Sequence, residues 1–129
     1  MDLRKPTVLG DVILDVPGGG YDNNFCITDY IDTTSEKFVA KVVHPQTGRI
    51  LEIFTNQPGV QFYTANNLSG TDNRGIIGKH GITYFKHGAF CLETQNFPDA
   101  INHKHFPDSI LRPHHLYYHI VTYKFGVQA

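Results

Sequence analysis

The sequence predicts an all-β protein, and three observations support this fold class. Short segments with alternating apolar and polar residues recur along the chain, and turn residues such as Pro58–Gly59 separate them. Apolar residues at helical spacing form no stretch of useful length. The chain has 129 residues, of which 40% are hydrophobic, so it suffices for one domain with a core. We therefore expect residues 1–129 to form a single β-sandwich domain.

The N-terminal part is predicted to be extended and rich in turns. Val8–Val16 alternates loosely, which predicts a strand or an extended arm. Pro17–Gly20 predicts a flexible loop, because its three glycines tolerate positive φ. Asp22 follows this loop, where an aspartate is most often a turn-former. Phe25–Thr28 predicts a short strand, and Thr33–Glu36 predicts a polar turn.

A β-hairpin is predicted next. Phe38–His44 and Arg49–Thr55 are its strands, and Pro45–Gly48 supplies the turn residues. Alternation would put three apolar residues on one face of the first strand: Phe38, Ala40 and Val42. The second strand is apolar on both faces, with Leu51 and Ile53 on one and Ile50 and Phe54 on the other. Such a strand is expected to be buried on both faces, in the middle of a sandwich.

Two further strands each combine an apolar face with a polar one. In Gln57–Asn66, Val60, Phe62 and Thr64 alternate with Gln61 and Tyr63. In Phe90–Asn102, Phe90, Leu92 and Thr94 alternate with Cys91, Glu93 and Gln95. A carboxylate such as Glu93 is expensive to bury without partners or a function, whereas in a surface strand it would simply lie in water. Amide, carboxylate and phenol groups beside aromatic surface are the mixture that a sugar site needs.

The remaining segments are two irregular stretches and a final strand. Asn67–Gly81 predicts a long loop, which in a compact domain is usually functional or mobile. His103–Pro113 is irregular, because prolines interrupt it. Leu116–Val127 predicts a long closing strand. Its first face would carry Tyr117, His119, Val121, Tyr123, Phe125 and Val127, and its more solvated face Thr122 and Lys124.

Composition argues against several classes of protein. The formal net charge is −1, and no basic run appears, which argues against nucleic acid as a partner. The N-terminus lacks the apolar stretch of a signal peptide, and no segment reaches the length of a membrane span. We expect Cys26 and Cys91 to be reduced core thiols of a cytoplasmic protein, the alternative being a disulfide between them.

Several motifs in this order resemble the galactose mutarotase (aldose 1-epimerase) family. Gln57–Thr64 and Phe90–Asn102 are similar to segments in the C-terminal part of the family's domain. Gly20–Phe25 is similar to the family's Gly-aromatic-Asp-His/Asn-Asn-Phe loop, and His44–Arg49 and Leu111–Pro113 also fit. The resemblance runs from about Asp2 to the end of the chain. It implies part of a mutarotase-like supersandwich.

The resemblance implies interconversion of the α and β anomers of galactose or glucose by acid–base catalysis. It makes Glu93 the general base and makes Asp22 and Gln61 binders of sugar hydroxyls. No metal and no organic cofactor is implied. The family's general-acid histidine, second active-site histidine and sugar-binding arginine come from upstream segments that this sequence does not contain. Lys86–Ala89 stands where the family usually has Lys-His-Ser-Gly, and Ala65–Gly70 also departs from the usual loop.

Two other classes of function remain open at this stage. One is a metal site built from His103, His105, His114, His115 and His119, although no cysteine pair or carboxylate of ligand spacing accompanies them. The other is a non-catalytic carbohydrate-binding or interaction module derived from a mutarotase. Strands that are apolar on both faces also predict self-association, or pairing with a polypeptide that supplies the missing N-terminal part.

Overall fold

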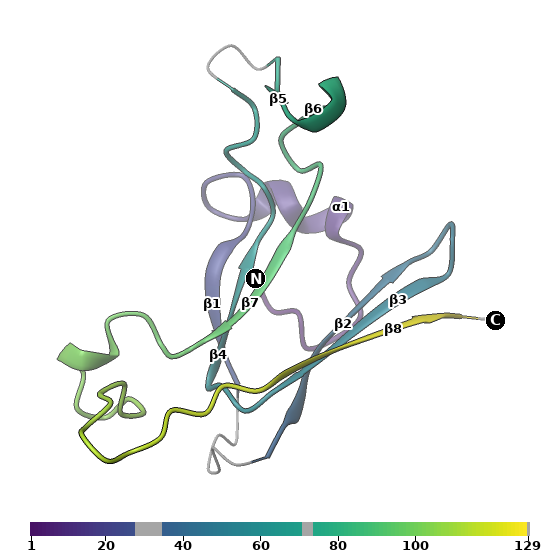
Figure 1. Cartoon of the computed structure of the whole chain (residues 1–129). Helices are drawn as coiled ribbons and strands as arrows, with labels where there is room; N and C mark the ends of the chain where they lie inside the picture. Colours follow the sequence, from purple (N-terminus) through teal and green to yellow (C-terminus); the bar gives the residue numbers. More distant parts are fainter. Residues whose placement is uncertain (28–34, 71–73, 129) are drawn as a thin grey trace. The chain divides into compact units, whose positions relative to one another are not determined.

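The computed structural model describes residues 1–27, 35–70 and 74–128 (Figure 1). Strands dominate, and the predicted all-β class is confirmed. The chain divides into two compact units. The first comprises Met1–Asn23 and Gln61–Glu93, and the second comprises Asn24–Val60 and Thr94–Ala129. Thr28, the first half of the turn predicted at Thr33–Glu36 and residues 71–73 of the loop predicted at Asn67–Gly81 lie outside the described residues.

The strands that carry the predicted site residues form one three-stranded sheet. Its strands are β1 (Asp22–Cys26), β4 (Gly59–Tyr63) and β7 (Cys91–Gln95), with β4 between the other two (Figure 1). Thr64 N donates to Tyr21 O at 3.0 Å, and Ile27 N donates to Pro58 O at 2.9 Å. Since the partner numbers fall as β1 advances, β1 and β4 run antiparallel.

The alternation predicted for β4 is confirmed. Val60, Phe62 and Thr64 are buried, whereas Gln61 and Tyr63 are half-buried. In the first unit, the Phe62 ring lies 5.0 Å from the Tyr21 ring, measured between centroids. One face of the strand therefore packs on aromatic residues, and the other presents an amide and a phenol.

The strand or extended arm predicted at Val8–Val16 is wrong. Leu9–Val12 forms a short helix, α1, and Ile13–Asp15 continues it as a 3-10 turn, η1. The reason lies in the spacing of the apolar residues, because Leu9, Val12, Ile13 and Val16 recur three or four positions apart. Val16 ends this segment and is buried.

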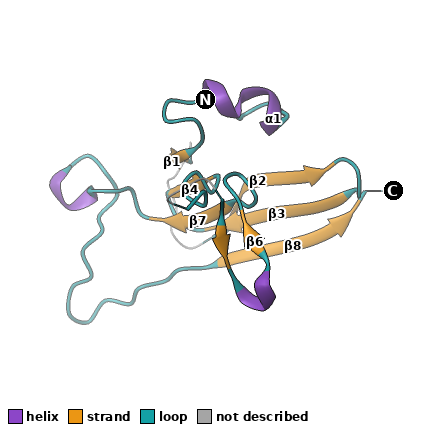
Figure 2. Cartoon of the chain, turned by 90° about the horizontal axis from the view of Figure 1, so that it is seen from above, coloured by secondary structure: helices purple, strands orange, loops and turns teal. Residues whose placement is uncertain are grey.

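The predicted hairpin is confirmed in the second unit. Its strands are β2 (Lys37–His44) and β3 (Arg49–Thr55), and β8 (Val121–Val127) pairs with the other edge of β3 (Figure 2). Both pairings are antiparallel. Gly48 closes the turn with a φ of +67°, and its N–H donates to His44 O at 2.8 Å. Glycine takes this left-handed conformation without steric penalty.

A β-bulge in β2 makes the predicted shared face of Phe38, Ala40 and Val42 wrong. Phe38 pairs with Phe54 and Ala40 pairs with Ile53, so the register shifts by one residue between them. Neighbouring residues of β3 point to opposite faces, so Phe38 lies on the face opposite Ala40. The rings of Phe38 and Phe54 accordingly pack edge to face, with centroids 5.7 Å apart.

The closing strand is shorter than predicted, since residues 116–120 are not in a strand. Side chains of the last residue of β3 and of the residue after it bond the backbone there. Asn56 Nδ2 donates to Tyr118 O at 3.1 Å, and Ile120 N donates to Asn56 Oδ1 at 2.8 Å. Thr55 Oγ1 donates to Ile120 O at 2.7 Å. Apart from the backbone bond from Asn56 N to Ile120 O at 3.3 Å, these side-chain bonds take the place of a regular backbone ladder.

The expectation that β3 is buried on both faces is wrong. Ile53 and Thr55 are buried on one face. On the other face, the Glu52 carboxylate lies 3.2 Å from Lys41 Nζ and 3.4 Å from Lys124 Nζ. The lysines lower the pKa of Glu52, chiefly through the hydrogen bond from Lys41. A charged cluster in contact with water therefore occupies part of a face that its apolar neighbours had marked as core.

The other elements are short. β5 (Ile76–Ile77), η2 (Lys79–Gly81) and β6 (Thr83–Tyr84) form a small antiparallel hairpin in the first unit. η3 (Ala100–Asn102) lies in the second unit. Within the described parts of the chain, none of the helices has the length and apolar character needed to cross a membrane.

Candidate functional site

Asp22 and Gln61 are in direct contact. Gln61 Nε2 donates to Asp22 Oδ1 at 2.8 Å, from the middle of β4 to the first residue of β1. Asp22 is exposed and Gln61 is half-buried. The pair thus combines a carboxylate and an amide at the surface, where sugar hydroxyls find both donors and acceptors.

Glu93 lies on β7, the strand next to β4, and its side chain is exposed. Of the two alternatives considered for this carboxylate, burial with partners or a position in water, the structure shows the second. The rings of Phe90 and Phe62 pack edge to face, with centroids 6.4 Å apart. Side chains alternate along a strand, so Cys91, Glu93 and Gln95 point away from this aromatic face. Gln61 points away from it in the same way on β4.

Thr64, directly after β4, joins the strand ends in the first unit. Its hydroxyl accepts a hydrogen bond from Tyr21 N at 2.9 Å and donates to Asn66 Oδ1 at 2.7 Å. Asn66 Nδ2 in turn donates to Tyr21 O at 2.9 Å. Tyr21 and Thr64 are both buried. This network was not predicted from the sequence, although a polar Thr and Asn just after an apolar strand were a signal for it.

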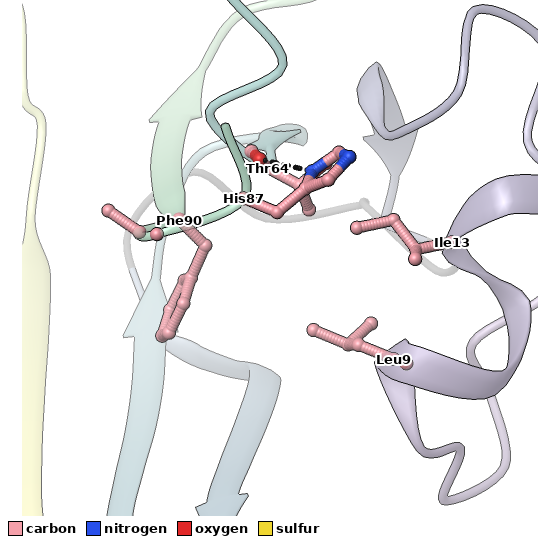
Figure 3. Close-up of a pocket in the computed structure, with 8 residues that line it drawn as sticks. Leu9, Ile13, Thr64, His87 and Phe90 are labelled. Atoms are coloured by element: carbon pink, nitrogen blue, oxygen red, sulfur yellow. Dashed lines mark hydrogen bonds between the residues drawn. The ribbon is translucent and has the colours of Figure 1, made fainter. Parts of the chain in front are cut away.

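His87 is attached to the same network. Its Nδ1 lies 2.9 Å from Thr64 O, as the dashed line in Figure 3 shows. A carbonyl oxygen only accepts hydrogen bonds, so Nδ1 carries the proton. Within the part of the chain that the structure describes, His87 Nε2 is buried and has no hydrogen-bond partner.

A pocket of about 280 Å³ lies beside His87 in the first unit. Leu9 and Ile13 line one side of it, and Phe90 lines the other (Figure 3). Thr64 also borders it, whereas the predicted site residues do not. The lining is mostly apolar, which suits a sugar with its many hydroxyls poorly.

The histidines of the second unit make other contacts than a metal site would need. His103 Nε2 lies 3.3 Å from Asp99 Oδ2, and its ring packs 4.8 Å from that of Phe106, measured between centroids. His119 Nε2 is hydrogen-bonded to Thr94 Oγ1 at 2.7 Å. Among the described residues, no three His, Cys, Asp or Glu side chains are grouped as ligands of one metal ion.

Cys26 and Cys91 are free thiols, and both are exposed. The expectation that they belong to the core is wrong. Each lies at the end of a strand, on the face that alternates with its apolar residues, so the neighbouring hydrophobic side chains did not indicate burial.

Comparisons with known proteins give one consistent result. Residues 1–124 match the model of a family described as aldose 1-epimerase. Over 126 residues, or 98% of this chain, the sequence is 48% identical to galactose mutarotase of Homo sapiens and 49% identical to that of Rattus norvegicus. It is 32% identical to aldose 1-epimerase of Escherichia coli (strain K12) over 108 residues, or 82% of this chain. The chain spans 35% of the length of the two mammalian relatives and 29% of the bacterial one.

Proposed function

The chain belongs to the aldose 1-epimerase family, and on this premise we propose that it carries the catalytic base and two sugar-binding residues of a mutarotase site. The reaction is the interconversion of the α and β anomers of galactose or glucose. Glu93 is the base, and Asp22 and Gln61 bind sugar hydroxyls. The observation that carries the proposal is the 2.8 Å hydrogen bond between Gln61 and Asp22, on the two strands that adjoin each other in the sheet of β7.

The exposure of Glu93 suits the role of base. A general base has to reach the hydroxyl of a substrate that arrives from water, at a heavy-atom distance of about 2.6–3.2 Å. The Glu93 carboxylate takes the proton from the anomeric hydroxyl while an acid protonates the ring oxygen. The bond between C1 and the ring oxygen breaks, the C1–C2 bond rotates, and the ring closes on its other face. Both protons then return, so no cofactor is consumed.

Asp22 and Gln61 share the task of orienting the sugar. Their mutual hydrogen bond fixes the direction of both groups, so Asp22 offers its second carboxylate oxygen as an acceptor and Gln61 its amide oxygen. Holding the sugar in one orientation lowers the entropic part of the barrier.

In the family that the chain resembles, the general acid comes from segments upstream of the part matched here. Loss of a positioned acid lowers the rate by roughly 10²–10⁴-fold. We therefore expect slow anomer exchange by the 129 residues alone and retained binding of the sugar. The alternative is a carbohydrate-binding module without catalysis, and the contact between Gln61 and Asp22 supports it as well, because these two groups can hold a sugar without any proton transfer.

Two measurements on the same variants test these proposals. Saturation-transfer NMR with D-galactose reports binding, and polarimetry on freshly dissolved α-D-galactose reports anomer exchange. We expect Glu93→Gln to remove the exchange above the buffer rate and to keep binding, whereas Asp22→Ala and Gln61→Ala lose binding. The matched control is Glu52→Gln, which replaces a glutamate of β3 in the other sheet. This variant should change neither sugar binding nor anomer exchange.

The outcomes separate the two candidate functions. Binding without exchange by the unmodified chain favours the non-catalytic module. Exchange that survives Glu93→Gln removes Glu93 as the base. Absence of galactose and glucose binding by the unmodified chain contradicts both functions.

The sheet of β2, β3 and β8 supports a proposal about partners. Tyr123 and Phe125 pair with Ile53 and Leu51 and share their face, yet they are 47% and 77% exposed. β8 is also an edge strand. Exposed apolar side chains beside a free strand edge promote association. We propose that this face self-associates or pairs with a polypeptide that supplies further strands of the family's domain.

A further inference from the structure

We propose that His87 is a positioning residue for the Asp22–Gln61 pair, acting through the carbonyl of Thr64. The relevance of this role to catalysis rests on the function proposed above, but the positioning itself is a separate property of the fold. His87, Thr64 and the two site residues all belong to the first unit.

The first argument comes from the way β1 and β4 pair at this end. Opposed residues of an antiparallel hydrogen-bonded pair normally exchange two backbone bonds. Thr64 N does donate to Tyr21 O at 3.0 Å, but Tyr21 N donates to Thr64 Oγ1 and leaves the Thr64 carbonyl free. His87 Nδ1 donates to that carbonyl. The imidazole therefore takes the place of the missing backbone bond.

The second argument comes from the backbone. His87 has a φ of 60° and Ala65 has a φ of 54°, and His87 N donates to Ala65 O at 3.3 Å. Non-glycine residues are uncommon in the left-handed region, and they stay there where the surroundings hold them. Both residues that flank the carbonyl contact are thus held in an unfavourable conformation, as at sites where geometry matters.

The third argument concerns which imidazole atom is used. Nε2 is buried and has no hydrogen-bond partner among residues 1–27, 35–70 and 74–128, whereas Nδ1 makes the contact with Thr64. A residue kept only for its bulk would not need this orientation. The chain tolerates an unpaired buried nitrogen, which is unfavourable, in order to retain the Nδ1–H donor.

The effect on the site follows from distance along the chain. Tyr21 immediately precedes Asp22, and Thr64 lies three residues after Gln61. The bonds between Tyr21 and Thr64 therefore fix the register of β1 relative to β4. A loosened end would let Asp22 move away from Gln61 Nε2, because the donor and acceptor must stay within about 3.2 Å.

Two amide substitutions distinguish the effect of the Nδ1–H donor of His87 from the effect of its side-chain volume. In His87→Asn, the side-chain amide takes the place of Nδ1 and restores the donor to Thr64 O. In His87→Gln, the amide takes the place of Nε2 and the donor is lost. Side-chain amide NMR signals of Gln61 report its bond to Asp22 without any sugar present. D-galactose affinity is measured on the same samples.

We expect His87→Asn to keep the Gln61 signals and the galactose affinity of the unmodified chain. His87→Gln should move the Gln61 signals to those of a free amide and weaken galactose binding by about tenfold, the loss expected for one hydrogen bond. Equal effects of both variants, or unchanged Gln61 signals in His87→Gln, overturn the positioning role. If the unmodified chain binds no galactose, the function proposed above fails, while the Gln61 signals still decide on positioning.

A measurement on the unmodified chain covers the case in which His87→Gln does not fold. Long-range ¹H–¹⁵N spectra of the imidazole distinguish its two neutral forms. The proposal requires the proton on Nδ1. A proton on Nε2 with a bare Nδ1 excludes the bond to the Thr64 carbonyl and overturns the proposal.

Discussion

Replacement of Gly20 by alanine should destabilise the chain far more than the same change at Gly18. Both glycines lie in the loop before β1 and have positive φ, +154° for Gly20 and +88° for Gly18. A Cβ on Gly18 would meet nothing within 4 Å. A Cβ on Gly20 would overlap Asn66 Oδ1 and approach His87 Cε1 to 2.8 Å. The two sites therefore share the backbone penalty and differ in the space available.

The magnitude follows from what must move. The Asn66 amide cannot swing aside freely, because it accepts from Thr64 Oγ1 and donates to Tyr21 O. Loss of these two bonds removes about 1 kcal/mol each. An alanine at the unfavourable φ adds about 1–3 kcal/mol. We expect Gly20→Ala to lower the free energy of unfolding by about 3–5 kcal/mol, and Gly18→Ala to lower it by the backbone share alone.

Urea unfolding followed by circular dichroism gives the comparison. With a slope of about 1–3 kcal/mol per molar urea, a difference of about 2 kcal/mol moves the midpoint by roughly 0.7–2 M. Gly10→Ala is a further control in α1, where a Cβ meets nothing within 4 Å and alanine should stabilise by up to about 1 kcal/mol. Equal midpoints for Gly20→Ala and Gly18→Ala contradict the packing described around Asn66.

Three further outcomes are expected in the second unit. Thr55→Val should lower the free energy of unfolding by about 1–3 kcal/mol in urea titrations, because it leaves the carbonyl of Ile120 without its hydroxyl donor. Thr122→Val, in the exposed strand β8, should change the free energy of unfolding by no more than about 0.5 kcal/mol. Similar losses for the two variants would contradict the burial assigned to Thr55. The pKa of Glu52 is lowered in the folded chain, so its ion pairs stabilise the fold above the ordinary carboxylate pKa, and this stability is lost as the pH falls through the lowered pKa. Glu52→Gln should therefore make thermal unfolding less sensitive to acid. An unchanged pH profile of the variant would contradict this. Phe125→Lys should reduce association of the purified chain in light scattering, whereas an unmodified chain that stays monomeric at high concentration would show that the apolar face needs no partner.

Local patterns predicted the strands well where alternation and turn residues agreed. The hairpin around Gly48 and the two faces of β4 are examples. The helical turn at Leu9 was missed because four apolar residues in a short segment fit both a loose alternation and a helical spacing. The bulge after Phe38 was also missed, since an extra residue in one strand has no signature in alternation alone.

The candidate site shows a similar division. The family motif singled out Asp22 and Gln61, and the structure brings them into contact. The role of Thr64 was not foreseen, because its hydroxyl bonds a residue 43 positions earlier in the chain. The exposure of the thiol at position 91 was also missed, since burial depends on what packs against a strand and not on its neighbours in sequence.

An NMR titration of the ¹⁵N-labelled chain with D-galactose tests the proposed sugar site most directly. We expect saturable shifts of the Gln61 side-chain amide and of the backbone amides of Asp22 and Glu93, with the amides of the β2–β3 hairpin unchanged. Spectra that stay constant up to high sugar concentration, or shifts centred on the hairpin, would contradict a sugar site formed by these three residues.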